Sequence, residues 1–250
     1  MSKIILHNGR CGSTYVYLVL DRYYRAKHGD NTTGSFGSIY ERTYNCLVEK
    51  YVGLNDYLVP EVIGSTTNNY HILLWPKENK KIKGLKNISG MIYPLMNTQD
   101  SDEKKQRRKL VNNLLKTHNV LLKHPLLTNP KPEWDVDYIS CERRDVRQQT
   151  KSLILSITTG IYHFKPGDER KIKRLKKFGP RPGTLDYWTK KVEKSWEIYR
   201  ALKPKTAQTV FMEDFENLKP FEVLEMVGIM DWNKYLNKDF DIPIRKAWHG

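Results

Sequence analysis

Short apolar runs alternate along the chain with longer stretches in which apolar residues recur every three or four positions. A short apolar run bounded by turn residues is typical of a buried strand, whereas a period near 3.6 is typical of an amphipathic helix. The runs predict strands at residues 3–7, 70–75, 119–123, 137–141 and 206–212, and the periodic stretches predict helices at 14–28, 38–51, 102–116, 145–159, 184–202 and 220–227.

This alternation predicts an α/β fold in three layers, with a central parallel sheet and helices on both faces. The sequence has no internal repeat and no low-complexity linker, so residues 1–250 are expected to form one domain. Residues 29–37 are rich in turn formers and predict a loop. Residues 165–183 are basic and interrupted by glycine and proline, which predicts a loop or a lid.

The charge balance favours anionic partners. The formal net charge is +15 at pH 7, which fits a phosphorylated nucleotide, an acidic acceptor or nucleic acid. No apolar run approaches the roughly 20 residues of a membrane span. The chain starts directly with a short strand, without the features of a signal peptide. Three cysteines, Cys11, Cys46 and Cys141, form no Cys-x-x-Cys motif. We therefore expect free thiols, no structural zinc site and a cytoplasmic location.

The turn after the first predicted strand has the features of an anion site. Gly9 and Gly12 allow the backbone to turn tightly, and the following helix directs its N-terminal N–H groups and its dipole toward this turn. Ser13 and Thr14 add hydroxyl groups, and Arg10 adds a permanent charge whose planar fork suits phosphate or sulfate oxygens. The turn lacks the G-x-x-x-x-G-K-[ST] pattern of a Walker A loop, including its lysine and magnesium-binding hydroxyl.

Residues 7–15, HNGRCGSTY, resemble the 5′-phosphosulfate loop of the sulfotransferases that use 3′-phosphoadenosine 5′-phosphosulfate (PAPS). In that loop a basic residue, any residue, a glycine and two hydroxyl residues follow the first strand. The small-molecule branch of the family usually has lysine at the position of Arg10, so this chain is closer to the carbohydrate and bacterial branches. The resemblance implies a P-loop nucleoside-triphosphate-hydrolase-like fold and a donor site formed by Arg10, Cys11, Gly12, Ser13, Thr14 and Tyr15, with Tyr15 near the adenine.

A second motif of the same family places an arginine at the end of a central strand and a serine eight residues later on the next helix. Arg144 and Ser152 have this spacing, at the junction of a predicted strand and helix. The resemblance implies that they hold the 3′-phosphate, which distinguishes this donor from ATP. Arg143 is the neighbouring alternative, but only Arg144 has the right spacing to the serine. The segment 211–215 resembles the family's tyrosine-glutamate-aspartate-leucine segment, whereas its glycine-rich C-terminal motif is absent.

Sulfuryl transfer is an in-line displacement, so the enzyme must position donor and acceptor and stabilise the charge that develops on the leaving oxygen. We assign the stabilisation of this charge to Arg10. We expect no metal requirement. A hydroxyl acceptor also needs a base, and the small-molecule branch uses the histidine of a Lys-Thr-His motif at a strand end. His118 has these letters but precedes a predicted strand, whereas His124 lacks the threonine and sits where that strand ends. We assign the base to His124, with His118 and then Glu41 as alternatives.

The resemblance predicts a sulfotransferase that moves a sulfuryl group from PAPS to a hydroxyl or amine acceptor, leaving adenosine 3′,5′-bisphosphate. The positive net charge is compatible with an anionic acceptor. Residues 29–100 and 165–183 are expected to be variable acceptor-side or lid segments. One alternative is a nucleotide-dependent kinase or NTPase on a similar fold, which the missing Walker lysine disfavours. A basic nucleic-acid-binding protein is the other, although the sequence contains no recognisable nucleic-acid-binding module.

Overall fold

The computed structural model describes residues 1–29, 32–35, 72–77, 112–113, 115–125, 134–159 and 182–242. The strands are β1 (Lys3–His7), β2 (Thr33–Ser35), β3 (Ile72–Pro76), β4 (His118–Pro125), β5 (Asp137–Glu142) and β6 (Gln208–Phe211). The helices are α1 (Ser13–His28), α6 (Val146–Thr159), α8 (Pro182–Leu202), α9 (Met212–Phe215) and α10 (Pro220–Met226), followed by a 3₁₀ turn at Trp232–Lys234.

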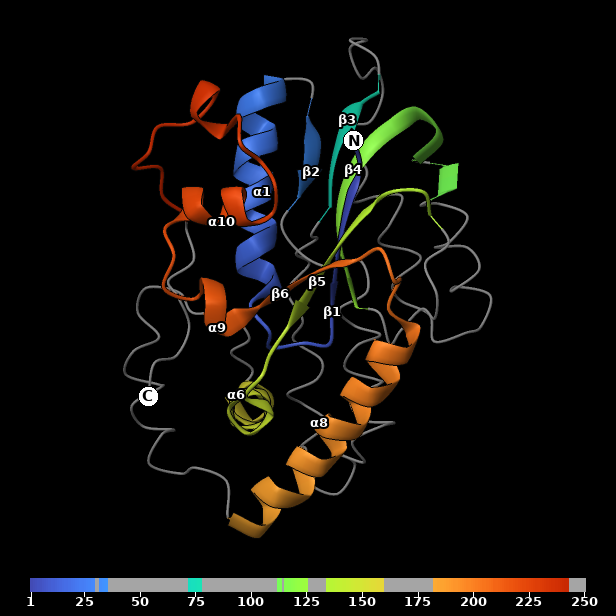
Figure 1. Ribbon diagram of the computed structural model, residues 1–250, viewed down its shortest axis with the longest axis vertical. Helices are drawn as coiled ribbons and strands as arrows, with labels where there is room; N and C mark the ends of the chain where they lie inside the picture. The colour runs from blue at the N-terminus through green and yellow to red at the C-terminus, as the bar shows by residue number, and fades with distance from the viewer. Residues whose placement is uncertain are drawn as a thin grey trace.

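The strands form one six-stranded sheet in the order β2-β3-β4-β1-β5-β6 (Figure 1). β1 is parallel to β4 on one side and to β5 on the other, and β5 is parallel to β6. β3 is antiparallel to β4, and β2 is antiparallel to β3. The expected parallel sheet is confirmed in part: β4, β1, β5 and β6 are parallel, and two antiparallel pairings toward the β2 edge make the sheet mixed.

Helices cover both faces of this sheet. Neighbouring residues of a strand point to opposite faces, and in the register of the sheet Lys123 is level with Ile5 whereas Ser140 is level with Leu6. Lys123 bonds to Thr14 at the start of α1, and the Ser140 hydroxyl bonds to Tyr199 of α8. α1, with α10 beside it, thus covers one face, and α8, with α6, covers the other. The predicted three-layer α/β arrangement is confirmed.

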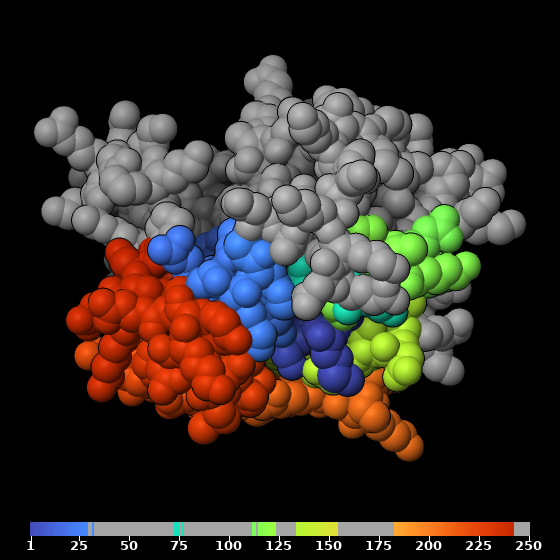
Figure 2. Space-filling model, turned by 90° about the horizontal axis from the view of Figure 1, so that it is seen from above, coloured from blue at the N-terminus to red at the C-terminus, as the bar shows by residue number. Residues whose placement is uncertain are grey.

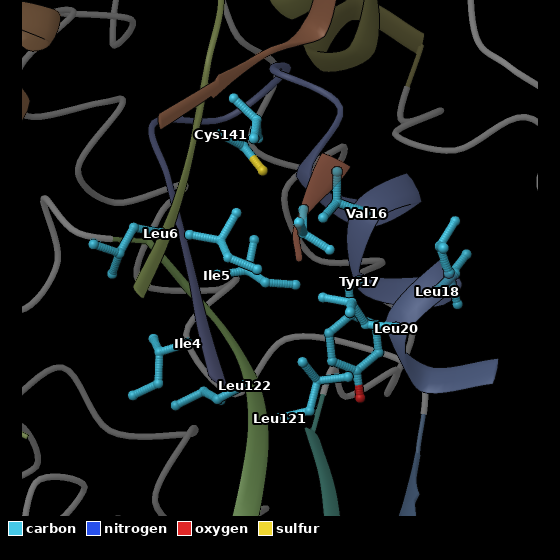
Figure 3. Close-up of a cluster of buried hydrophobic side chains, with 14 of the residues drawn as sticks. Ile4, Ile5, Leu6, Val16, Tyr17, Leu18, Leu20, Leu121, Leu122 and Cys141 are labelled. Atoms are coloured by element: carbon cyan, nitrogen blue, oxygen red, sulfur yellow. The ribbon is translucent and has the colours of Figure 1, made fainter. Parts of the chain in front are cut away.

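The core lies between β1 and the two helical layers. Ile4, Ile5 and Leu6 are fully buried, and Figure 3 shows Ile5 on the α1 side while Ile4 and Leu6 point to the opposite side. Val16, Tyr17 and Leu20 of α1 complete the Ile5 side of the core. Because β1 is buried on both faces, it reads as a continuous apolar run rather than an alternating one.

The helix ends follow their local sequences. α1 begins after Gly12, which has a φ of 73°, and it ends with Arg25, Lys27 and His28, whose charges complement the helix dipole. α10 begins with Pro220, and the Glu222 carboxylate accepts the Lys219 backbone N–H in a capping box. Within the described residues, no helix combines the length and the apolar character needed to span a bilayer.

Several predictions fall on residues outside those described. The predicted helix at 38–51, most of the one at 102–116 and nearly all of the segments 29–100 and 165–183 are among them. Two described parts correct the predictions. Thr33–Ser35 forms β2 inside the expected loop at 29–37, and Pro182 and Gly183 begin α8 instead of ending a lid.

Candidate functional site

The loop between β1 and α1 has an unusual backbone. Gly9, Arg10 and Gly12 have φ values of 75°, 50° and 73°. The value at Arg10 is uncommon for a residue with a side chain, so the surrounding contacts must hold it there. Gly12 cannot be replaced by a larger residue unless neighbouring atoms move, because a Cβ at this position would lie 2.7 Å from ring atoms of Phe215.

Two side chains from the β5–α6 segment hold the carbonyl groups of this loop. Gln149 Nε2 donates to the Gly9 carbonyl at 2.7 Å, and Trp196 Nε1 in turn donates to Gln149 Oε1. Arg143 donates from one terminal nitrogen to the Arg10 carbonyl at 3.3 Å. Carbonyl oxygens repel anions, so engaging them favours anion binding at the loop. The first turn of α1 contains no acidic residue that would compensate its dipole.

Arg10 and Ser152, which belong to two separate predicted motifs, are in direct contact. Arg10 Nε donates to Ser152 Oγ at 3.0 Å, across 142 residues of sequence. Ser152 lies on α6, which follows β5, and Arg10 follows β1, the neighbour of β5 in the sheet. The parallel pairing of these two strands brings both motifs to the same end of the sheet.

Lys123 is a site residue that the sequence motifs did not indicate. Its side chain is buried, and its Nζ donates to Thr14 Oγ1 at 2.9 Å. Burying a lysine is costly unless its ammonium group finds partners. The lysine in the apolar run NVLLK was the signal that could have identified it. It places a positive charge behind the hydroxyl groups of the loop.

The adjacent arginines 143 and 144 have different environments. The Arg143 side chain is buried against the loop, with its Nε 3.8 Å from Glu213 Oε1. Arg144 is half exposed and forms a bidentate ion pair with Asp214, at 2.6 and 2.8 Å, while its guanidinium lies over the Phe211 ring. Hydrogen bonding to Arg144 holds the pKa of Asp214 below its usual value. Among the described contacts, Ser152 bonds Arg10, and no hydrogen bond joins it to Arg144.

Glu213 fixes the turn that carries these arginines. Its carboxylate accepts the backbone N–H groups of Arg144 and Asp145 at 3.1 to 3.2 Å. The segment 211–215, singled out for its family resemblance, therefore contacts the second predicted motif through Phe211, Glu213 and Asp214. Sequence spacing alone gave no sign of this contact.

The remaining loop residues differ in what they can contact. Cys11 is fully buried, and this burial raises the pKa of its thiol, so only its backbone can face a ligand. Ser13 and Thr14 are buried at the start of α1. The Tyr15 hydroxyl donates to the Leu218 carbonyl at 3.3 Å, its ring stacks on Phe215, and burial raises its pKa to about 12.

The candidate bases lie at different ends of the sheet. His124 pairs in register with Leu6 near the C-terminal end of β4, beside the end of β1 that leads into the loop. His118 is the first residue of β4, level with Pro76 at the opposite end, where its Nδ1 is hydrogen-bonded to Thr117 Oγ1. The assignment of the base to His124 stays a prediction. Glu41 lies outside the described residues.

Two surface hollows formed by described residues lie away from this loop. One, of about 470 Å³, is lined by α1 residues such as Arg22 and by residues 235–237, 239 and 240. The other, of about 370 Å³, is lined by residues at the N-terminal ends of β1 and β5, including Lys3 and Asp137. Figure 2 looks onto that end, where the first residues of the chain lie beside α1. The described residues contain no group of three or more His, Cys, Asp or Glu that could hold a metal ion.

Comparison with models of known protein families, with curated proteins and with solved structures found no match to this chain.

Proposed function

We propose that this protein is a sulfotransferase that moves the sulfuryl group of PAPS to a hydroxyl acceptor. The observation that carries the proposal is the Arg10–Ser152 hydrogen bond, because it joins the two motifs that the resemblance assigns to the two ends of one donor. A ligand that spans both must carry an anionic group at each end. Adenosine with 5′-phosphosulfate and 3′-phosphate groups meets this requirement.

The 5′-phosphosulfate would be held by the loop 10–14. The N-terminal N–H groups of α1, the Arg10 guanidinium and the buried ammonium of Lys123 all favour negative charge there. During transfer the acceptor oxygen bonds to sulfur while the bond from sulfur to the bridging phosphate oxygen breaks. Negative charge then grows on the departing oxygen, and Arg10 would stabilise it. His124 would take the proton from the acceptor hydroxyl.

The 3′-phosphate would be held by Arg144 and Ser152. A guanidinium has five N–H groups, of which two are bonded to Asp214 in the structure. The serine hydroxyl can donate its proton to a phosphate oxygen while accepting the Arg10 hydrogen bond. Adenosine 3′,5′-bisphosphate, the nucleotide that remains after transfer, would keep these 3′ contacts.

The kinase alternative fits this loop less well. Magnesium-dependent phosphoryl transfer uses a loop hydroxyl and a carboxylate to hold the metal ion. Here Thr14 is bonded to Lys123, and the carboxylates of Glu213 and Asp214 are engaged by the turn at residues 143–145 and by Arg144. These contacts favour an anionic ligand without a metal ion.

Calorimetric titration with adenosine 3′,5′-bisphosphate and with AMP tests the proposal. Loss of the charge-assisted 3′ contacts should cost AMP roughly 2–3 kcal/mol of binding free energy. Equal affinities for the two nucleotides would rule out the donor assignment. ATP with magnesium and a mixed oligonucleotide serve as competitors for the kinase and nucleic-acid alternatives, and neither should shift the melting temperature as much as the bisphosphate.

A further inference from the structure

The two residues assigned to the 3′-phosphate are engaged on opposite sides of β5. Ser152 bonds Arg10, which follows β1, whereas Arg144 bonds Asp214, which follows β6. In the sheet, β5 lies between β1 and β6. Arg144 is thus bonded to a carboxylate on the side of β5 away from the strand that carries the donor loop.

Asp214 binds Arg144 in the manner of an oxyanion ligand. Both carboxylate oxygens accept from the two terminal nitrogens of the guanidinium, at 2.6 and 2.8 Å. This is the fork geometry with which arginine also binds phosphate. Both side chains are about half exposed, 52% and 47%, so a ligand in solution can reach the pair. Phe211 covers one face of the guanidinium at 4.1 Å and would remain beneath it if the carboxylate left.

We infer that Asp214 competes with the 3′-phosphate of the nucleotide for Arg144 and so sets how tightly and how selectively 3′-phosphorylated nucleotides bind. This inference rests on the proposed function. Asp214 weakens binding of the 3′-phosphate in two ways. Its ion pair must be loosened before Arg144 can turn fully to a phosphate, and its negative charge repels the incoming phosphate. A nucleotide without a 3′-phosphate leaves the pair intact.

The solvent exposure of the Arg144–Asp214 ion pair limits how strongly Asp214 can compete with a phosphate. Ion pairs between exposed side chains are weak, and a bidentate arginine–carboxylate pair lies at the upper end of their range. A carboxylate held this way can therefore be displaced by a dianionic phosphate. The competition also favours release of adenosine 3′,5′-bisphosphate after transfer, since Asp214 can re-form its pair as the product leaves.

Asp214→Asn tests the inference, because it removes the charge and the second acceptor oxygen with little change in volume. Calorimetry should show adenosine 3′,5′-bisphosphate binding about fivefold tighter than to the wild type, with AMP affinity unchanged. Asp214→Ser should have the same effect, and thermal unfolding without ligand checks that both variants fold.

Asp186→Asn is the matched control. Asp186 forms a comparably exposed ion pair with Arg147, at 2.6 Å, three residues along the chain from Arg144. Asp186→Asn changes the net charge by the same amount as Asp214→Asn but leaves the Arg144–Asp214 pair intact. Its bisphosphate affinity should therefore equal that of the wild type. In an Arg144→Ala background, Asp214→Asn should no longer tighten bisphosphate binding, because its effect is transmitted through Arg144.

The outcomes separate this inference from the proposed function. A wild-type protein without preference for the bisphosphate over AMP overturns the function and the inference together. A wild-type preference combined with unchanged binding to Asp214→Asn overturns the inference alone. Weaker bisphosphate binding to Asp214→Asn also overturns it, since Asp214 would then orient Arg144 for the phosphate instead of competing with it.

Discussion

Ser152 Oγ accepts a hydrogen bond from Nε of Arg10, the only residue other than glycine with a positive φ in the described chain. Since the bond uses Nε–H, the hydroxyl helps to fix the direction in which the terminal nitrogens of Arg10 point. The same serine is assigned to the 3′-phosphate, so one hydroxyl serves both ends of the proposed donor.

Ser152→Val and Ser152→Thr separate this hydroxyl from the shape of the side chain. Valine should weaken binding of AMP as well as of adenosine 3′,5′-bisphosphate, each by about tenfold, because the arginine loses its anchor. Threonine keeps a hydroxyl and should retain most of both affinities. Calorimetry on the two variants measures this, and valine affinities equal to those of the wild type would show that the bond does not matter for binding.

Gly12→Ala should destabilise the protein by about 2–4 kcal/mol, because alanine strains the left-handed backbone and its Cβ collides with Phe215. Gly29→Ala is the matched control: its φ is also positive, at 53°, but nothing lies within 4 Å of the added atom. It should cost only about 1 kcal/mol. Denaturant unfolding measures both, and equal costs would mean that the Phe215 ring moves freely.

Lys123→Met should leave the protein folded and weaken bisphosphate binding roughly tenfold, because methionine fills the buried space without the charge. Lys3→Met changes the same charge on β1, at the end of the sheet opposite the loop, where Lys3 pairs with Asp137. It should leave nucleotide affinity unchanged. If Lys123→Met instead lowers the melting temperature and leaves affinity intact, Lys123 only supports the structure.

His124→Ala should abolish transfer of labelled sulfuryl to the acceptor while leaving adenosine 3′,5′-bisphosphate affinity unchanged, as expected of a base. His118→Ala should change neither, since His118 begins β4 at the opposite end of the sheet. Transfer that survives in His124→Ala would move the assignment to another base, with Glu41 the first to be replaced.

Stability in acid should depend on Glu142, which is buried and bonded to Lys203 and Arg200. Burial alone would raise the pKa of this carboxyl, but its partners outweigh burial and hold the pKa below the usual 4.5. Because the pKa of Glu142 is lower in the folded state, its ionised carboxylate stabilises the protein at pH values above the usual pKa. This stabilisation is lost as the pH falls through the lower pKa of the folded state. Glu142→Gln should therefore cost roughly 3 kcal/mol at pH 7. The difference from the wild type should shrink only below about pH 4.5, as urea unfolding across pH can measure.

Most elements could be predicted because their signals are local. β1 and the predicted strand at 3–7 coincide, and α1, β5, α6, α8 and α10 begin and end within two residues of their predictions. The ends of an apolar run buried on both faces, or of a periodic stretch stopped by glycine or proline, can be recognised from the local sequence. Strand direction carries no such signal, which is why the antiparallel pairing of β3 was missed.

The site was predictable in part for the same reason. Gly9, Arg10 and Gly12 form a local pattern, and the structure places them on a turn with positive φ values. The partners of Arg144 were not predictable, because Asp214 and Phe211 lie about 70 residues away and reach it only through the pairing of β5 with β6. The anchoring of the loop by Gln149 depends on tertiary packing in the same way.

The central place of β1 has a consequence for biosynthesis. Its partners begin at His118 and Asp137, so they are made long after residues 3–7. At about 5–20 residues per second, the delay is on the order of ten seconds. An apolar strand with two unpaired edges is meanwhile open to association with other chains. Because the loop is anchored by residues 143–152, the nascent chain should acquire nucleotide affinity only after α6 has left the ribosome, and truncations ending before it should aggregate.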